Sequence, residues 1–296
     1  MKDSLPFFSL IVPTYERPAQ LASCLGALAR LDYSPERFEV IIVDDGSAVA
    51  PASVVEQFRE SLDVSLYSQK NSGPASARNF GVQHARGAVL AFTDDDCEPD
   101  PLWLRALAAR FARTPDRIVG GRTLNALPLN LYSETSQTII EVVYAHFNAD
   151  PEDARFFASN NLAIPAGLFR ELRGFDETFN TSEDRELCDR WLARGFRMTY
   201  APEAVVRHSH VLTLRSLWRQ HFGYGRGARR FHHARATRGE GRFKPDMDFY
   251  LKLLRASSSQ TRKTRAAQLT ALLLWSQLAN TAGLFYERLR PDQRGA

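Results

Sequence analysis

The stretch AVLAFTDDD, at residues 88–96, is an apolar run that ends in three adjacent carboxylates. Its residues 88–93 are small, apolar or β-branched, which is typical of a buried strand. A second strand-like run followed by acids lies upstream, where the largely apolar residues 38–43 are followed directly by Asp44 and Asp45. In open α/β sheets, ligands bind beyond the carboxyl ends of the strands. We therefore expect both acidic clusters to lie at one edge of a single sheet.

Strand-like and helix-like segments alternate around these two runs. Strands are predicted at residues 7–12, 38–43, 64–67, 88–93 and 118–120, and helices at residues 18–31, after Pro51, from near Pro74 and at residues 101–112. This alternation is typical of βαβ units and predicts an α/β fold with a parallel sheet. Further along, residues 156–164 are predicted to be extended and residues 183–194 to be helical, whereas residues 121–155 show no regular pattern.

Composition and charge divide the chain into two parts. Its 296 residues are 44% hydrophobic and 24% charged, which is ordinary for a globular protein with a sizeable core. Residues 1–214 contain 21 Lys and Arg against 29 Asp and Glu, a net charge of −8, whereas residues 215–296 contain 17 against 5, a net charge of +12. We predict a catalytic domain over residues 1–213 and a basic, helical extension over residues 214–296.

The cysteines and the amino-terminal region predict a reducing, cytoplasmic location. Cys24, Cys97 and Cys188 lie far apart without a CxxC pair, which argues against a disulfide framework and against a structural zinc site. The apolar run at residues 7–12 is too short for a secretory signal and is followed by Pro13.

Asp94, Asp95 and Asp96 form the strongest candidate metal site. Adjacent carboxylates repel one another unless a cation compensates. On an extended backbone, residues two apart point the same way, so we expect Asp94 and Asp96 to converge on one ligand. Oxygen ligands suit Mg²⁺ or Mn²⁺, and substrate phosphates complete the coordination shell. The alternatives are a solvated acidic turn and a helix N-cap before Pro101.

Two other segments are candidates for nucleotide contacts. A strand-end acid such as Asp44 or Asp45 can accept hydrogen bonds from a ribose hydroxyl or a base N–H, although the absence of GxGxxG disfavours a nicotinamide cofactor. Residues 71–79 form a turn that opens into a small-residue helix, whose amides and Arg78 can face an anion or a base edge.

Together, these segments resemble the family 2 glycosyltransferases in order and spacing. The matching segments are Pro13-Thr14-Tyr15-Glu16-Arg17, Val43-Asp44-Asp45-Gly46-Ser47, Gly73-Pro74-Ala75-Ser76-Ala77-Arg78-Asn79 and Phe92-Thr93-Asp94-Asp95-Asp96, followed by residues 157–161, 174–177, 183–188 and 206–208. The resemblance implies the GT-A fold, a Rossmann-like mixed sheet flanked by helices, here with a basic helical extension at the carboxyl end.

The resemblance also implies roles for individual residues. The implied donor-binding residues are Pro13, Thr14, Tyr15, Glu16, Asp44, Asp45, Arg78, Asp94 and Asp95. Asp96 resembles the last acid of a DxD element and is an implied ligand of Mn²⁺ or Mg²⁺. His208 resembles the histidine that some relatives use as a further metal ligand, and imidazole suits Mn²⁺ better than Mg²⁺. An ordinary surface or core histidine is the alternative for His208, and His210 is a weaker candidate.

Asp184 matches the position of the general base. A positioned carboxylate can remove the proton of an acceptor hydroxyl as that oxygen attacks, and attack from the face opposite the leaving group inverts the anomeric configuration. The alternative is structural, because Thr181-x-x-Asp184 is also a capping-box pattern. Both can hold for the same residue.

The extension predicts contact with an anionic membrane surface. Residues 215–265 contain 14 basic and 3 acidic residues, with Leu214, Leu217, Trp218 and Phe222 at helical spacing beside them. Residues 266–286 then form an uncharged run long enough for a bilayer, although Gln268, Gln277 and Asn280 disfavour spanning. A spanning helix, an interfacial helix and a helix packed on the protein all stay open.

The sequence thus predicts a metal-dependent, inverting glycosyltransferase that moves a sugar from a nucleotide diphosphate, UDP being expected, to a hydroxyl of a glycan or lipid-linked acceptor. It is predicted to be cytoplasmic, with peripheral attachment at the inner face of the cell membrane. The alternatives are a nucleotidyltransferase acting on a sugar phosphate and a catalytically silent module that binds nucleotide-sugars or membranes. Nucleic-acid binding is disfavoured, because the acidic part of the chain repels phosphate backbones.

Overall fold

The computed structural model describes residues 5–239, 246–258 and 263–290 of the chain. Its contacts divide the chain into two compact units that alternate along the sequence. The first unit contains Met1–Ala126, Phe147–Thr178 and Asp184–Ser209, and the second contains Leu127–His146, Phe179–Glu183 and His210–Ala296. These units are defined by contacts, so the functional boundary at residue 213 stays a prediction.

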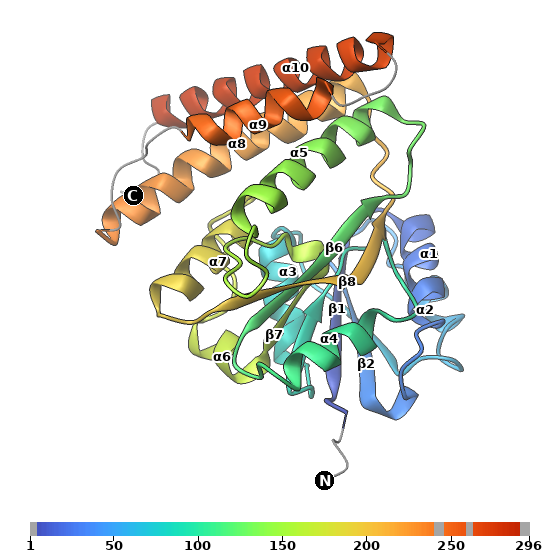
Figure 1. Ribbon diagram of the computed structural model, residues 1–296. Helices are drawn as coiled ribbons and strands as arrows, with labels where there is room; N and C mark the ends of the chain where they lie inside the picture. Colours follow the sequence, from blue (N-terminus) through green and yellow to red (C-terminus); the bar gives the residue numbers. More distant parts are fainter. Residues whose placement is uncertain (1–4, 240–245, 259–262, 291–296) are drawn as a thin grey trace. The chain divides into compact units, whose positions relative to one another are not determined.

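The first unit is built on an eight-stranded mixed sheet with the order β3-β2-β1-β4-β7-β6-β8-β5 (Figure 1). The strands are β1 (Phe8–Thr14), β2 (Phe38–Asp44), β3 (Val64–Ser68), β4 (Val89–Phe92), β5 (Cys97–Pro99), β6 (Ile118–Asn125), β7 (Leu162–Pro165) and β8 (Met198–His208). β1 to β4 are parallel, β7 is antiparallel to β4 and β6, and β8 is parallel to β6 and antiparallel to β5. The predicted α/β class with a mixed sheet is confirmed.

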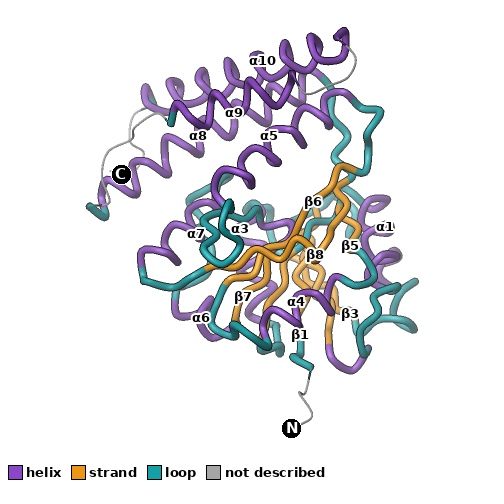
Figure 2. The backbone as a smooth tube through the Cα atoms, viewed as in Figure 1, coloured by secondary structure: helices purple, strands orange, loops and turns teal. Residues whose placement is uncertain are grey.

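Helices connect and cover these strands, as the tube in Figure 2 makes clear. The first unit contains α1 (Pro18–Leu28), α2 (Ala52–Glu56), α3 (Pro74–Gln83), α4 (Trp103–Phe111), α6 (Ala166–Glu171) and most of α7 (Glu183–Ala193). Proline opens α1 and α3, where its missing N–H costs no hydrogen bond. The predicted helices 18–31, 101–112 and 183–194 are therefore confirmed, with ends that differ by a few residues.

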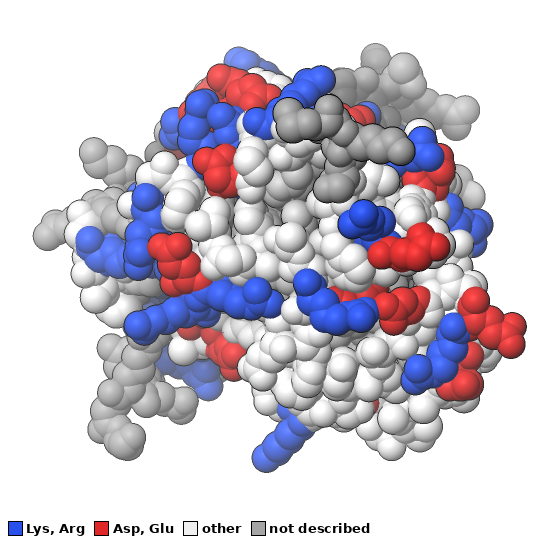
Figure 3. Space-filling view, turned by 90° about the horizontal axis from the view of Figure 1, so that it is seen from below, with Lys and Arg blue, Asp and Glu red and all other residues white. Residues whose placement is uncertain are grey.

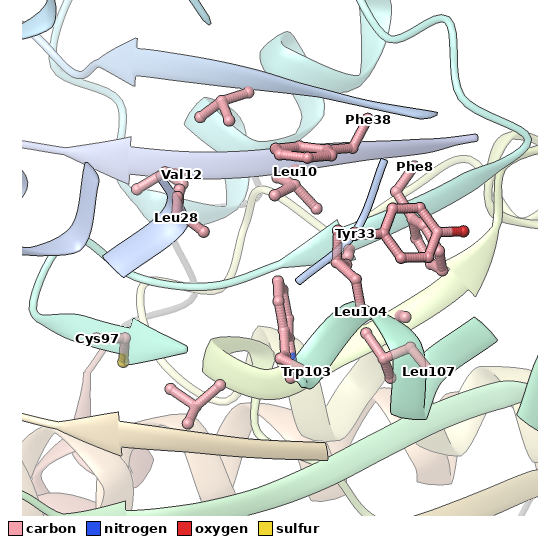
Figure 4. Packing of buried hydrophobic residues seen from close by; sticks show 14 of the residues in the cluster. Phe8, Leu10, Val12, Leu28, Tyr33, Phe38, Cys97, Trp103, Leu104 and Leu107 are labelled. Atoms are coloured by element: carbon pink, nitrogen blue, oxygen red, sulfur yellow. The ribbon is translucent and has the colours of Figure 1, made fainter. Parts of the chain in front are cut away.

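Alternation along β1 sends side chains to both faces of the sheet. Figure 4 shows Phe8, Leu10 and Val12 packed with Leu28 of α1 and with Trp103 of α4 in the main hydrophobic core. Ile11 points to the other face, where α3 approaches so closely that a Cβ on Gly81 would lie 2.8 Å from Ile11 Cγ2. The small residues of α3 therefore let this helix lie directly against β1.

Two strands and two helices were not predicted from the sequence. β5 contains only three residues and ends in Pro99, so it carries little local strand signal. β8 and α6 were not identified, and α5 (Leu131–Phe147) lies in the region predicted to lack a regular pattern.

The surface in Figure 3 shows basic and acidic residues intermingled, and exposed ion pairs such as Arg105–Asp32 occur in the first unit.

The second unit is helical. It contains α5, α8 (Leu214–Thr237), α9 (Met247–Ser258) and α10 (Lys263–Leu289), and Figure 1 shows α8, α9 and α10 running alongside one another. Val142, Leu253 and Leu273 join α5, α9 and α10 in a small core. α8 and α10 touch through glycines, since a Cβ on Gly283 would lie 2.0 Å from the carbonyl oxygen of Phe222. Among the described residues, no helix combines the length and the apolar character needed to cross a bilayer.

Candidate active site

The strand-end acids meet at one edge of the sheet, as the sequence predicted. β1 lies between β2 and β4, so the end of β1 separates the two acidic clusters. Thr14, the last residue of β1, joins them. Its carbonyl oxygen accepts a hydrogen bond from the Asp45 N–H at 2.9 Å, and its hydroxyl donates to Asp95 Oδ2 at 2.8 Å. This edge therefore carries both clusters in one hydrogen-bonded arrangement.

Asp94, Asp95 and Asp96 lie in a turn, which corrects the expectation of an extended backbone. The Cys97 N–H donates to the Asp94 carbonyl oxygen at 3.1 Å, closing the turn. The chain turns here because β5 follows at once and pairs with β8. Asp94 forms an ion pair with Arg78 at 2.6 Å, whereas Asp95 accepts its hydrogen bond from Thr14. The alternation argument for Asp94 and Asp96 is therefore wrong.

The alternatives for this cluster are excluded by burial and position. Asp95 and Asp96 are buried, so they do not form a solvated acidic turn. α4 begins at Trp103, and its N-cap position is Leu102, so neither acid caps that helix. Three carboxylates held in and beside a buried turn need polar or charged partners, and the structure supplies several.

Asp96 lies against His208, a residue that comes much later in the chain, at the end of β8. The register of β5 and β8 pairs Cys97 with His208, and this brings His208 Nε2 to 3.1 Å from Asp96 Oδ1. Asp96 Oδ1, Cys97 Sγ and His208 Nε2 all lie within 4.8 Å of one another. The structure thus brings together the two residues that the sequence resemblance named as metal ligands, and it adds a thiol beside them.

The local charges shift the pKa values of these groups. Burial raises the pKa of Asp95 to about 6, although the Thr14 hydrogen bond and Arg17 act in the opposite direction. Burial lowers the pKa of His208, but the hydrogen bond that its Nε2–H donates to Asp96 and the charges of Asp96 and Asp94 outweigh this effect, so its pKa is raised. Burial and the same two carboxylates raise the pKa of the Cys97 thiol. The turn therefore favours bound protons or cations.

Arg17 supplies a positive charge that the site prediction omitted. Its Nη1 lies 3.3 Å from Asp95 Oδ1 and 3.1 Å from Asp96 Oδ2, and about half of its side chain is exposed. Arg17 closes the predicted segment at residues 13–17, so its sequence position already pointed to the site. What the sequence could not reveal was its pairing with acids of a distant segment.

The predicted donor-binding residues around Asp45 hold loops in place. Asp45 Oδ1 accepts hydrogen bonds from Gln69 and from the Ser72 N–H, and Asp45 Oδ2 accepts one from the Gly73 N–H. This fixes the turn before α3, which carries Arg78 toward Asp94. Asp44 accepts a hydrogen bond from the Ser47 N–H at 3.1 Å.

The segment after β1 is tied to the segment after β2. Glu16 has a φ of 55° and accepts a hydrogen bond from the Ala48 N–H at 2.6 Å, while its own N–H donates to the Ser47 hydroxyl. Pro13 is part of β1, and Tyr15 stands exposed just beyond the strand. Among the residues of this segment, Tyr15 therefore offers a large exposed ring at the sheet edge.

Two asparagines outside the predicted set fix the frame around this edge. Asn79 of α3 donates to the Phe175 carbonyl oxygen and accepts from the Phe175 N–H, which attaches the segment at residues 174–177. Asn161 accepts a hydrogen bond from the Trp103 indole N–H at 2.9 Å and donates to the Ala204 carbonyl oxygen. Both lie in segments that carry the family resemblance, so their position was the available signal.

Asp184 is the second residue of α7 and is half-buried. Its Oδ1 accepts a hydrogen bond from the Arg185 N–H at 2.7 Å. α7 begins at Glu183, so the residue before the helix is Ser182, and the Thr181 hydroxyl donates to the Gly223 carbonyl oxygen. Thr181 thus lies two positions before the helix, and both the capping-box alternative and the role of Asp184 as a base stay predictions.

Known proteins share both the sequence pattern and the fold. The chain matches the family model described as glycosyl transferase family 2 over residues 9–166, more than half of its length, and the model described as glycosyl transferase family group 2 over residues 89–286. It is 26% identical over 235 residues to glycosyltransferase AglE of Haloferax volcanii, covering 77% of this chain and 74% of AglE. It is 31% identical over 230 residues to validoxylamine A glucosyltransferase of Streptomyces hygroscopicus subsp. limoneus, covering 68% of this chain but only 51% of that protein.

Solved structures support the fold. Mannosyltransferase PcManGT from Pyrobaculum calidifontis, in complex with GDP-Man and Mn²⁺, has a TM-score of 0.68 at 18% identity and covers 97% of this chain and 88% of its own. S. aureus TarS 1–349 in complex with UDP-GlcNAc has a TM-score of 0.55 at 17% identity and covers 95% of this chain and 90% of its own. The family match and these neighbours confirm the sequence prediction: the chain belongs to glycosyl transferase family 2 and is a glycosyltransferase with the GT-A fold.

Proposed function

We propose that this protein is a metal-dependent, inverting glycosyltransferase. It would transfer a sugar from a nucleotide diphosphate sugar, with UDP as the expected nucleotide, to a hydroxyl of a glycan or lipid-linked acceptor. The observation that carries the proposal is the single sheet edge at which Thr14 joins both acidic clusters and Asp96 meets His208. Nucleotide-sugar donors in the solved relatives PcManGT and TarS support it.

The residues at this edge fit a divalent cation. Asp96 and His208 supply a carboxylate and an imidazole, and this donor set suits Mn²⁺ better than Mg²⁺. Asp96 and His208 would hold the ion, and the Cys97 thiol lies within reach of the same position. When bound, the ion would neutralise the negative charge that develops on the leaving diphosphate. The Mn²⁺ in the PcManGT structure supports this assignment.

The donor nucleotide would lie along the ends of β1, β2 and β4. We assign Asp44, Asp45 and Asp94 to the nucleoside, with Thr14, Asp95 and Arg78 completing the pocket. The exposed ring of Tyr15 is suited to contact with a base or sugar. Pro13 and Glu16 shape this wall, because Glu16 fixes the loop after β2 through its hydrogen bond with Ala48.

Asp184 is the proposed general base. Its place in the first turn of α7 holds the carboxylate on a regular element, and the hydrogen bond from the Arg185 N–H orients one oxygen. The other oxygen would take the proton of the acceptor hydroxyl while that hydroxyl oxygen attacks the anomeric carbon. The bond to the diphosphate oxygen breaks on the opposite side, so the anomeric configuration inverts.

Cellular location follows the same proposal. We propose that the enzyme is cytoplasmic and attached peripherally at the inner face of the cell membrane. The net charge of +12 over residues 215–296 supports attraction to anionic lipids, and the three buried free cysteines are compatible with a reducing compartment.

A product-release screen tests the catalytic proposal. The purified chain is incubated with a panel of nucleotide-sugars and acceptors, with and without Mn²⁺, and the released products are separated. We expect nucleoside diphosphate in an amount matching glycosylated acceptor, and only when Mn²⁺ is present. In a parallel reaction with a nucleoside triphosphate and a sugar phosphate, release of pyrophosphate would instead identify a nucleotidyltransferase. Donor binding without turnover would identify a silent binding module.

A further inference from the structure

The exposed face of α10 is apolar over most of its length. We define the α10 face as Leu274, Trp275, Leu278, Phe285 and Tyr286, whose side chains are 38–60% exposed. Their spacing places them on one side of the helix, whereas Leu269, Leu273, Ser276 and Ala279 are buried on the other. α10 carries no charged residue between Arg265 and Glu287. Such an apolar strip on a surface helix, interrupted by the exposed Thr281, marks a contact site.

Aromatic pairs extend the α10 face onto α8. The rings of Trp218 and Trp275 lie 4.6 Å apart, and those of Phe222 and Tyr286 lie 5.5 Å apart. The Arg226 guanidinium lies over the Tyr286 ring at 5.5 Å. Tryptophan and tyrosine favour the boundary between hydrocarbon and water, because one end of the side chain is apolar and the other polar. This border therefore has the chemistry of a membrane interface.

The charge beside the α10 face is mostly positive, although Glu287 of α10 forms ion pairs with Arg226 and Arg230. α8 contains six arginines and no acidic residue, and Arg215 and Arg219 are exposed on either side of Trp218 in the sequence. Cations next to an interfacial apolar strip are attracted to anionic headgroups. Two copies meeting through the same face would bring these arginines toward one another, which is unfavourable.

From these observations we infer that the α10 face and the exposed Arg215 and Arg219 of α8 form a docking surface for an anionic lipid bilayer. This inference rests on the proposed peripheral location and assigns it to named residues. The opposite side of α10 stays packed on α8, since a Cβ on Gly225 would lie 1.8 Å from the Asn280 carbonyl oxygen. α10 would therefore lie in the plane of the headgroups, with its axis along the membrane.

Vesicle sedimentation of the full chain tests this surface. Vesicles of phosphatidylcholine alone are compared with vesicles that also contain phosphatidylglycerol, at low and high salt. We expect binding to the anionic vesicles to exceed binding to the neutral ones by about tenfold or more and to weaken with salt. Leu278→Glu with Phe285→Glu should remove this binding, and Arg215→Ala with Arg219→Ala should remove the preference for anionic vesicles.

Val49→Glu is the matched control, because Val49 is 83% exposed and lies in the first unit. This variant should bind vesicles like the wild type. Leu278 and Phe285 are about half exposed, so the double variant should fold, which circular dichroism checks. Sugar transfer to a soluble acceptor should be unchanged in that variant, which separates failure of the surface from failure of the catalytic proposal. Equal binding by the wild type and the double variant would overturn the inference. So would self-association that the double variant abolishes, in a protein that binds neither type of vesicle.

Discussion

His208 Nε2 lies 3.1 Å from Asp96 Oδ1, although the two residues belong to distant parts of the chain. β5 and β8 make this contact, because their register places His208 opposite Cys97, the neighbour of Asp96. The three residues of β5 therefore have a function beyond extending the sheet. They place Asp96, the last acid of the turn, beside His208, the last residue of β8.

Removing the imidazole should weaken the metal site. We expect His208→Ala to reduce the apparent affinity for Mn²⁺ by about 10–100-fold, in the range seen when groups around a metal are removed. Donor binding without metal should be unchanged. Calorimetric titration of Mn²⁺ in the presence of nucleoside diphosphate measures this effect, with His84→Ala, an exposed histidine of the first unit, as control. Wild-type Mn²⁺ affinity in His208→Ala would remove His208 from the site.

Arg17 should compete with a metal ion for the acidic turn. Arg17→Ala leaves Asp95 and Asp96 without that cation, so we expect the melting temperature without metal to fall by about 2–4 °C. Mn²⁺ should then stabilise the variant more than it stabilises the wild type. Arg86→Ala is the matched control, because Arg86 pairs with the buried Glu39 away from the turn. Equal responses of the two variants to Mn²⁺ would refute the competition.

Gly120 should tolerate no side chain. A Cβ at this position of β6 would lie 2.0 Å from the buried ring of Phe157. We expect Gly120→Ala to lower the free energy of unfolding by about 1–3 kcal/mol through overpacking. Gly167→Ala is the control, because no atom lies within 4 Å of a Cβ there. Chemical denaturation measures both variants, and equal unfolding free energies would show that the Phe157 ring moves aside without cost.

His221 should make the second unit sensitive to acid. Burial lowers the pKa of His221 to about 4, and the charge of His210 acts in the same direction. The unfolded chain therefore binds more protons than the folded chain between about pH 4 and 6.5, and stability falls as the pH falls through this window. At pH 5 the loss should be about 2 kcal/mol relative to neutral pH.

Replacing the ring of His221 separates its contribution from that of other groups. His221→Phe keeps a ring at the position and should make unfolding less sensitive to pH between neutrality and pH 5. His233→Phe, at an exposed position of α8, should keep the wild-type dependence. Unfolding followed by circular dichroism at both pH values measures this, and an unchanged pH dependence in His221→Phe would contradict the assignment.

The sequence predicted the parts of the fold that local patterns encode. β1 to β4 and the helices α1, α3, α4 and α7 follow apolar periodicity and proline positions, and the acids after β2 and β4 follow from where those strands end. β5 and β8 escaped prediction because their strand character depends on partners distant in the sequence, β8 for β5 and both β6 and β5 for β8. A three-residue strand ending in Pro99 has almost no local signal.

The candidate site was predictable as a set of residues but not as a set of contacts. The ordered motifs identified Thr14, Asp95, Asp96 and His208, yet nothing local indicated that the Thr14 hydroxyl would bond Asp95. The turn at residues 94–97 was missed, because alternation holds only while the strand continues, and β4 ends at Phe92. Side-chain pairing between distant segments is a tertiary property that periodicity does not contain.

The central claim is that Asp96 holds the cation for the donor diphosphate while Asp184 acts on the acceptor. Donor binding in the presence of Mn²⁺, measured for Asp96→Asn and Asp184→Asn beside a single-turnover transfer assay, tests it most directly. We predict that Asp96→Asn loses metal-dependent donor binding, whereas Asp184→Asn binds the donor almost normally and fails to transfer the sugar. Equal loss of donor binding in both variants, or normal transfer by Asp184→Asn, would contradict the account.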